Sequence, residues 1–196
     1  MTGLTLGSLQ VETPVVLAPM AGITNAAYRR LCAEQGAGLY VCEMITSRGL
    51  VEGDQHTKDM LVFDELETVR SVQLYGTDPV YVGKAAEILC AEYGVAHIDL
   101  NFGCPVRQVT VKAHSGSWLL RDPARVGAIV ARVVEACDGV PVTAKIRLGC
   151  ADDCRTAIEV AQRVEEAGAS CLTVHGRVAS QFFTGRADWE AIAAVK

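Results

Sequence analysis

Short apolar runs alternate with longer, capped segments along this chain, and this alternation limits the fold more than any other feature. Six runs between turn residues are predicted to be strands: 15–18, 39–43, 70–75, 95–100, 141–146 and 170–175. Helices are predicted in the longer segments, with Asn or Asp at most starts and Gly after most ends: 25–35, 78–93, 122–138, 152–167 and one from about residue 188. Apolar strands that alternate with helices are typical of a parallel sheet covered by helices.

Two parallel folds fit this alternation, an open doubly wound sheet and a closed barrel. A doubly wound dinucleotide fold carries a Gly-rich turn after its first strand, and the Pro-Met-Ala-Gly sequence of residues 19–22 lacks that pattern. We therefore predict an α/β fold of the TIM (β/α)8 barrel type. Such a barrel needs eight strand–helix units and about 250 residues, whereas this 196-residue chain supplies about six. We expect residues 1–196 to form one domain, the N-terminal portion of an incomplete barrel.

Composition and charge narrow the class of protein. No apolar run approaches the ~20 residues that cross a bilayer, and the N-terminus lacks the features of a secretory signal, so a cytoplasmic protein is expected. The net charge of −5 argues against a chain that grips nucleic acid over its whole surface, although a local basic patch is compatible with it. Of the eight cysteines, only Cys150 and Cys154 are closely spaced, and no second pair or nearby His completes a metal site. No metal is therefore expected.

Polar residues follow almost every predicted strand. They lie in these segments: 19–22, 43–44, 73–76, 101–104, 145–147 and 175–177. The carboxyl ends of barrel strands face one pocket, so these residues would converge there. Any single one of them could be a solvated or structural residue, but the joint pattern favours a functional site.

Cys104 stands out because its turn would place a thiol at the mouth of the predicted cleft. The sequence Asn101-Phe102-Gly103-Cys104-Pro105 directly follows the run 95–100. Gly allows a sharp turn, and Pro prevents the chain from continuing the strand ladder. On this local sequence alone, Cys104 could be a proton donor, a nucleophile, a redox sensor or a buried spectator.

Other residues in these segments suit a flat, polar heterocycle such as a flavin. Lys145 lies in an otherwise apolar strand, so its ammonium requires an anionic or electron-rich partner. Gln73 can donate and accept in one plane, and His175 can donate to a carbonyl oxygen or a phosphate. With Cys104 as proton donor, this set favours a reduction. The rival hypothesis is a Cys104 nucleophile with His175 as its base, although no acyl-transfer motif surrounds either residue.

Six segments together resemble one known family. They are Pro19-Met20-Ala21-Gly22-Ile23-Thr24-Asn25, Gln73-Leu74-Tyr75-Gly76, Asn101-Phe102-Gly103-Cys104-Pro105, Leu119-Leu120-Arg121-Asp122-Pro123, Lys145-Ile146-Arg147 and His175-Gly176-Arg177. In this order and spacing they resemble the tRNA-dihydrouridine synthases, most closely the bacterial DusB branch, from about residue 14 to the last residue. Residues 4–11 resemble the short hairpin that precedes the first strand in that family.

The resemblance implies an FMN-binding (β/α)8 barrel that reduces the C5–C6 double bond of particular uridines in tRNA, with NADPH as the electron donor. It implies that hydride passes to C6 and that Cys104 protonates C5 as a general acid. The full-length protein would be a monomer with tRNA as its partner, and the uridine would leave its base stack. The implied FMN contacts are Pro19, Met20, Ala21, Gln73, Lys145 and His175, and Asn101 and Arg147 would help to hold the base or the flavin.

Two departures from the family pattern bear on these expectations. The loop 111–118 is less Gly-rich than in the family, and residues 1–196 contain neither the segments of strands seven and eight nor the C-terminal helical domain. Because barrels bind phosphate at those strands, we expect the chain alone to bind FMN weakly. We also expect it to be unstable as a monomer, because strands one and six would be open, apolar edges. Two alternatives stay open: a flavin barrel that reduces free pyrimidines or enoates, and a non-catalytic, truncated remnant.

Overall fold

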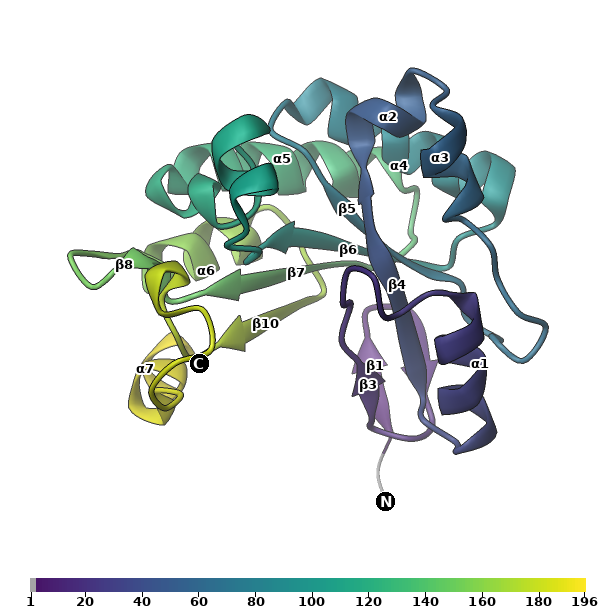
Figure 1. Ribbon diagram of the computed structural model, residues 1–196, viewed down its shortest axis with the longest axis horizontal. Helices are drawn as coiled ribbons and strands as arrows, with labels where there is room; N and C mark the ends of the chain where they lie inside the picture. Colours follow the sequence, from purple (N-terminus) through teal and green to yellow (C-terminus); the bar gives the residue numbers. More distant parts are fainter. Residues whose placement is uncertain (1–2) are drawn as a thin grey trace.

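A single sheet of six parallel strands forms the centre of the computed structural model, which describes residues 3–196 (Figure 1). The strands are β3 (Val16–Leu17), β4 (Leu39–Thr46), β5 (Ser71–Tyr75), β6 (His97–Phe102), β7 (Val142–Arg147) and β10 (Cys171–His175). All pairings between neighbours are parallel. The spatial order, β10-β7-β6-β5-β4-β3, follows the order along the chain. A doubly wound sheet reverses its strand order at a switch point, so this topology is that of a barrel.

The remaining elements connect or flank these strands. The helices are α1 (Ala26–Glu34), α2 (Ser47–Val51), α3 (Gln55–Asp59), α4 (Pro79–Tyr93), α5 (Pro123–Ala136), α6 (Ala157–Glu166) and α7 (Trp189–Val195). Two antiparallel hairpins pair β1 (Leu4–Leu6) with β2 (Leu9–Val11) and β8 (Gly149–Ala151) with β9 (Cys154–Arg155). The short helical turns are η1 (Gln108–Lys112), η2 (Gly116–Arg121) and η3 (Ala179–Gln181). Within residues 3–196, none of the helices is both long and apolar enough to span a membrane.

The sheet is curled rather than flat. In Figure 1, β3 and β10 lie on opposite sides of an opening, and α4, α5 and α6 lie behind and above the sheet on its outer side. Val16 of β3 and Thr173 of β10 line the same cavity, so the two edges curve toward each other. The main apolar core lies between the strands and these outer helices. The prediction of an incomplete (β/α)8 barrel with six strands is confirmed.

Local capping signals set the helix ends, as the sequence predicts. Asp78 accepts a hydrogen bond from the N–H of Val80, Pro79 opens α4, and Gly94 follows its end with a φ of 60°. Glycine is favoured at Gly94 because residues with a Cβ rarely adopt that left-handed conformation. Helix α5 begins in the same way after Asp122. The predicted hairpin at residues 4–11 is also present.

Three predicted boundaries are wrong. Helix α6 begins at Ala157 rather than near residue 152, because residues 149–155 form the β8–β9 hairpin. Gly149 makes this hairpin feasible, since a Cβ there would lie 1.9 Å from the carbonyl oxygen of Cys154. The first strand is only two residues long, and the second continues to Thr46. Helix α2 then begins at Ser47, in a segment without a predicted helix.

A buried ion pair ties α1 to the segment between α3 and β5. Arg29 Nε lies 2.7 Å from Glu67 Oε2, and both side chains are almost completely buried. The other guanidinium nitrogens donate to the carbonyl oxygens of Thr24 and Val62. Thr24 Oγ1 in turn bonds the N–H and the carbonyl oxygen of Met20. The ion pair therefore also supports the turn that follows β3.

Candidate functional site

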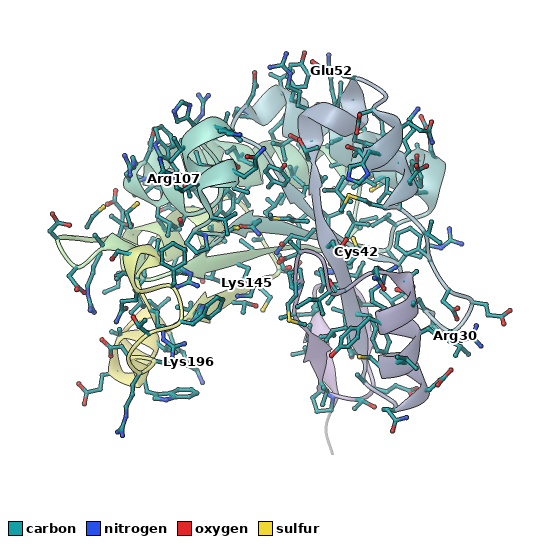
Figure 2. All side chains as sticks on the ribbon, viewed as in Figure 1. Arg30, Cys42, Glu52, Arg107, Lys145 and Lys196 are labelled. Atoms are coloured by element: carbon teal, nitrogen blue, oxygen red, sulfur yellow. The ribbon has the colours of Figure 1, made fainter. Side chains whose placement is uncertain are left out.

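A cavity of about 470 Å³ lies at the carboxyl ends of the strands, and we call it the upper cavity. Figure 2 shows Lys145 on β7, near the middle of the molecule. The structure brings together every residue that the sequence predicts for the site, while their individual roles stay predictions. These residues are Pro19, Met20, Ala21, Gln73, Asn101, Cys104, Lys145, Arg147 and His175.

Polar side chains join β5, β6 and β7 on the inner face of the sheet. On β6, His97, Asp99 and Asn101 alternate with apolar residues, as a period of two requires for one face of a strand. Asn101 Nδ2 donates to Gln73 Oε1 (2.8 Å), and Gln73 Nε2 donates to Asp99 Oδ2 (2.5 Å). Asp99 Oδ1 accepts a third bond from Thr143 (2.6 Å). This chain of bonds fixes the orientation of both amides at the floor of the upper cavity.

Asp99 and Lys145 extend from this floor into a lower cavity of about 140 Å³, which both residues line. Burial raises the pKa of the Asp99 carboxyl, against the opposing hydrogen bonds from Thr143 and Gln73. Burial likewise lowers the pKa of Lys145, although the charge of Asp99 opposes this shift. Within residues 3–196, Lys145 forms no ion pair. Its ammonium, which also faces the upper cavity, therefore suits an anionic or electron-rich ligand.

The Asn101 side chain holds the turn that presents Cys104. Its Oδ1 accepts hydrogen bonds from the N–H groups of Gly103 (3.1 Å) and Cys104 (2.9 Å). The carbonyl oxygen of Cys104 accepts from the N–H of Ser117, and Gly116 permits this approach because a Cβ there would lie 2.7 Å from that oxygen. Burial raises the pKa of the Cys104 thiol. The thiol is therefore protonated at neutral pH and can act as an acid.

His175 is a donor rather than a base at neutral pH. Its Nε2 lies 3.1 Å from Arg177 Nη1, and because a guanidinium only donates, this nitrogen accepts and the proton is on Nδ1. Burial, together with the charges of Arg147, Lys145 and Arg177, lowers the pKa of His175 to about 4. In the described part of the chain, the hydrogen bond of its ring is to Arg177 and not to Cys104. The nucleophile–base pair of the rival hypothesis therefore has no support in this geometry.

Arg147 directs its guanidinium at main-chain carbonyl groups around the upper cavity. It donates to the carbonyl oxygens of Gly103 (3.1 Å), Val178 (3.2 Å) and Phe182 (2.8 Å). The same guanidinium lies 5.7 Å over the ring of Phe183. These contacts join the Cys104 turn to the segment after β10, and a direct contact of Arg147 with a base or a flavin stays a prediction.

Several residues around the cavity were not among the predicted site residues. Asp99 could have been found because His97, Asp99 and Asn101 alternate with apolar residues along β6 and so share one face. Arg177 lies in a segment that the sequence singles out, but its contact with His175 depends on the tertiary structure. Phe182 and Phe183 line the upper cavity while 46% and 77% exposed, and no sequence pattern indicates this position.

Comparison with known proteins agrees with this arrangement. The family model described as dihydrouridine synthase (Dus) matches residues 16–196. The chain belongs to the dihydrouridine synthase family. The chain is 44% identical to the probable tRNA-dihydrouridine synthase of Mycobacterium tuberculosis, over 98% of the chain and 52% of that protein.

Two further relatives carry the name tRNA-dihydrouridine synthase B. The chain is 43% identical to that of Pseudomonas aeruginosa, over 97% of the chain and 57% of the relative. It is 44% identical to that of Escherichia coli, over 97% of the chain and 59% of the relative. The chain thus spans about half the length of the curated relatives that it matches.

The loop 111–118, which departs from the family pattern, packs tightly against its neighbours. It contains the end of η1 and the start of η2, and Ser115 and Ser117 are buried within it. Ser115 Oγ donates to the carbonyl oxygen of Gly76 (3.0 Å), which joins the loop to the end of β5. His114 and Gly116 both have positive φ, and of the two only Gly116 is free of a steric penalty. The loop is therefore held against the Cys104 turn despite its few glycines.

Lowering the pH is expected to destabilise this fold through His97. Burial lowers the pKa of His97 from 6.5 to about 4, so the folded chain favours the neutral imidazole. The stabilisation is complete above pH 6.5 and is lost as the pH falls toward 4, a change of about 3 kcal/mol. Urea unfolding between pH 7 and 4 should show a smaller loss in a His97→Gln variant. Equal losses in both proteins would contradict this expectation.

Proposed function

We propose that this chain forms the catalytic part of a tRNA-dihydrouridine synthase, which reduces particular uridines of tRNA to 5,6-dihydrouridine with FMN as cofactor and NADPH as electron donor. Family membership and the names of the relatives support the reaction. The observation that carries the proposal is the upper cavity, which is lined by both a protonated thiol, Cys104, and the ammonium of Lys145. Within residues 3–196, this ammonium forms no ion pair.

The residues present fit the ring system of FMN. Pro19, Met20 and Ala21 form one wall of the cavity, against which a flat ring can pack. Lys145 and His175 would face the electron-rich edge of that ring, with the ammonium and the Nδ1–H as donors. Positive charge at this edge lowers the cost of negative charge on a reduced ring. Gln73, whose amide is already oriented by Asp99, would offer a fixed hydrogen-bonding plane.

Cys104 would supply the proton of the reaction. When bound, FMN supplies the hydride that adds to C6 of the uracil. Addition at C6 places negative charge at C5 and O4, and C5 then needs a proton from a nearby acid. Cys104 holds that proton on Sγ, and burial keeps it there at neutral pH. The charge of Arg147 favours the thiolate that remains, which regains a proton from solvent.

Reconstitution would test the proposed function. The protein is expressed at the length that its gene encodes, loaded with FMN, and mixed with NADPH and tRNA from a strain that lacks the gene. Dihydrouridine should appear in the tRNA, detected by mass spectrometry of the nucleosides, with one NADPH oxidised for each. Reduction of free pyrimidines or enoates without dihydrouridine in tRNA would contradict the proposal and favour another flavin barrel.

Lys145→Met is expected to weaken FMN binding about 10- to 100-fold, because a hydrogen bond to a charged group contributes ~1.5–3 kcal/mol. Titration of the flavin-free protein with FMN, followed by flavin fluorescence, measures the dissociation constant. Lys84→Met on the outer helix α4 removes the same charge from an exposed position that lines neither cavity, and should leave binding unchanged. If the Lys145 and Lys84 variants bind FMN with equal affinity, Lys145 does not contribute to FMN binding as proposed.

A further inference from the structure

A hollow of about 220 Å³ adjoins the upper cavity and is distinct from the lower cavity, and the proposed reaction does not use it. Pro105 and Phe182 line both spaces. A group bound in the hollow would therefore lie directly beside a ligand in the upper cavity. The other lining residues are Thr110, Val111, Ser117, Trp118, Arg121, Cys150, Ala179 and Ser180.

The hollow contains an aromatic ring with a cation stacked on it. The guanidinium of Arg121 lies 5.0 Å over the ring of Trp118, and the ring of His114 lies 5.0 Å from the same ring. Trp118 is half-buried and packs against the main core, whereas Arg121 is exposed. In residues 3–196, Arg121 forms no ion pair. An anchored ring beside a guanidinium without a carboxylate partner is a combination that stacks nucleobases and attracts phosphates.

The segments that supply most of the lining of the hollow are basic, whereas the chain as a whole is acidic. The chain has 18 Lys and Arg against 23 Asp and Glu. The segments 100–121 and 175–187, which supply nine of the ten lining residues, contain no Asp or Glu. Figure 2 shows Arg107 at the outer surface of this region. The basic residues of the two segments are Arg107, Lys112, Arg121, Arg177 and Arg186. Asp122 and Asp188 directly follow these segments, and the excess of positive charge that remains favours a polyanion.

We propose that the hollow is a subsite for the base of a nucleotide next to the target uridine in single-stranded RNA. The inference rests on the proposed function, because it places the uridine in the adjoining upper cavity. When a uridine leaves its base stack, the neighbouring base loses a stacking partner. A stacking surface formed by Trp118 and Arg121 would replace the lost stacking. Stacking uses the π-face that every base has, so the subsite adds affinity without a strong sequence preference.

Binding of short RNA probes tests the subsite. Dye-labelled pentaribonucleotides with a central uridine, either intact or lacking the base on one side of that uridine, are titrated against the FMN-loaded protein by fluorescence anisotropy. The wild-type protein should bind the intact probe roughly 5- to 100-fold more tightly than one of the two abasic probes. Arg121→Gln and Trp118→Leu should each reduce this preference. Arg121 is exposed, so its variant preserves the fold even if Trp118→Leu does not.

Control measurements separate a subsite for a base from two alternatives. These are a general effect of positive charge and a binding site for the electron donor. Lys84→Gln removes a positive charge on α4, outside the hollow, and should keep the preference. Equal binding of intact and abasic probes by the wild-type protein, or a preference unchanged in both variants, would overturn the subsite. A slower FMN reduction by NADPH in the variants with unchanged probe binding would also overturn it, and would assign the hollow to the electron donor. Absence of dihydrouridine formation in the wild-type protein would refute the proposed function without changing the outcome of these titrations.

Discussion

Cys104→Ser is expected to slow dihydrouridine formation by about 10²- to 10⁴-fold, the usual contribution of a positioned general acid. The hydroxyl of serine is a far weaker acid than a thiol, while the turn around it is held by main-chain bonds to Asn101 that the substitution leaves in place. Single-turnover reduction of tRNA by FMN-loaded, pre-reduced protein measures this step directly. Binding of FMN should be unchanged, which separates a lost proton donor from a damaged cavity.

The pH profile provides a readout that a structural role of Cys104 would not change. Because burial raises the pKa of the thiol, the wild-type rate should be constant through neutral pH and fall only above the ordinary thiol range. That fall should be absent in Cys104→Ser. Cys32→Ser in α1, at a half-buried cysteine that does not line the upper cavity, serves as the matched control and should keep the wild-type rate. A wild-type rate in Cys104→Ser would exclude the thiol as the acid.

Glu67→Ala is expected to lower the free energy of unfolding by about 3–5 kcal/mol, because it leaves the buried Arg29 guanidinium without its counter-charge. Both side chains of this ion pair are almost completely buried, and Arg29 also bonds Thr24 and Val62. Chemical denaturation followed by circular dichroism measures the change. Since Thr24 is bonded to Met20 at the wall of the upper cavity, FMN binding should weaken in the same variant.

The exposed ion pair of the same helix provides the control. Arg30 and Glu34 are 3.3 Å apart with side chains 51% and 44% exposed, and exposed pairs contribute roughly 0–1 kcal/mol. Glu34→Ala should therefore change the stability much less than Glu67→Ala. Similar losses in the two variants would show that the buried ion pair has no special role in the fold.

The sequence predicts features that depend on local signals better than features that depend on tertiary contacts. Helix α4 could be predicted almost to the residue because Asp78, Pro79 and Gly94 act within one turn of its ends. The site could be predicted as a group because parallel strands bring their carboxyl ends to one edge, whatever lies between them. The upper cavity follows from that rule, and all nine predicted residues line it.

Features that depend on strand register or on loop packing could not be predicted in this way. The bonds of Asp99 to Gln73 and Thr143 need the alignment of three strands, which no single segment encodes. The β8–β9 hairpin interrupts a segment whose composition also suits a helix. Phe183 lines the upper cavity from the segment after β10, where Arg147 bonds the carbonyl groups of Val178 and Phe182.

The protein is proposed to reduce uridine in tRNA with Cys104 as the acid. The most direct test maps dihydrouridine in the tRNA of a strain that lacks this gene. At least one tRNA position should lose its dihydrouridine in the deletion strain. The wild-type gene should restore it, and the Cys104→Ser gene should not, although its product still binds FMN. Unchanged dihydrouridine at every position after deletion, or full restoration by Cys104→Ser, would contradict the proposed function and mechanism.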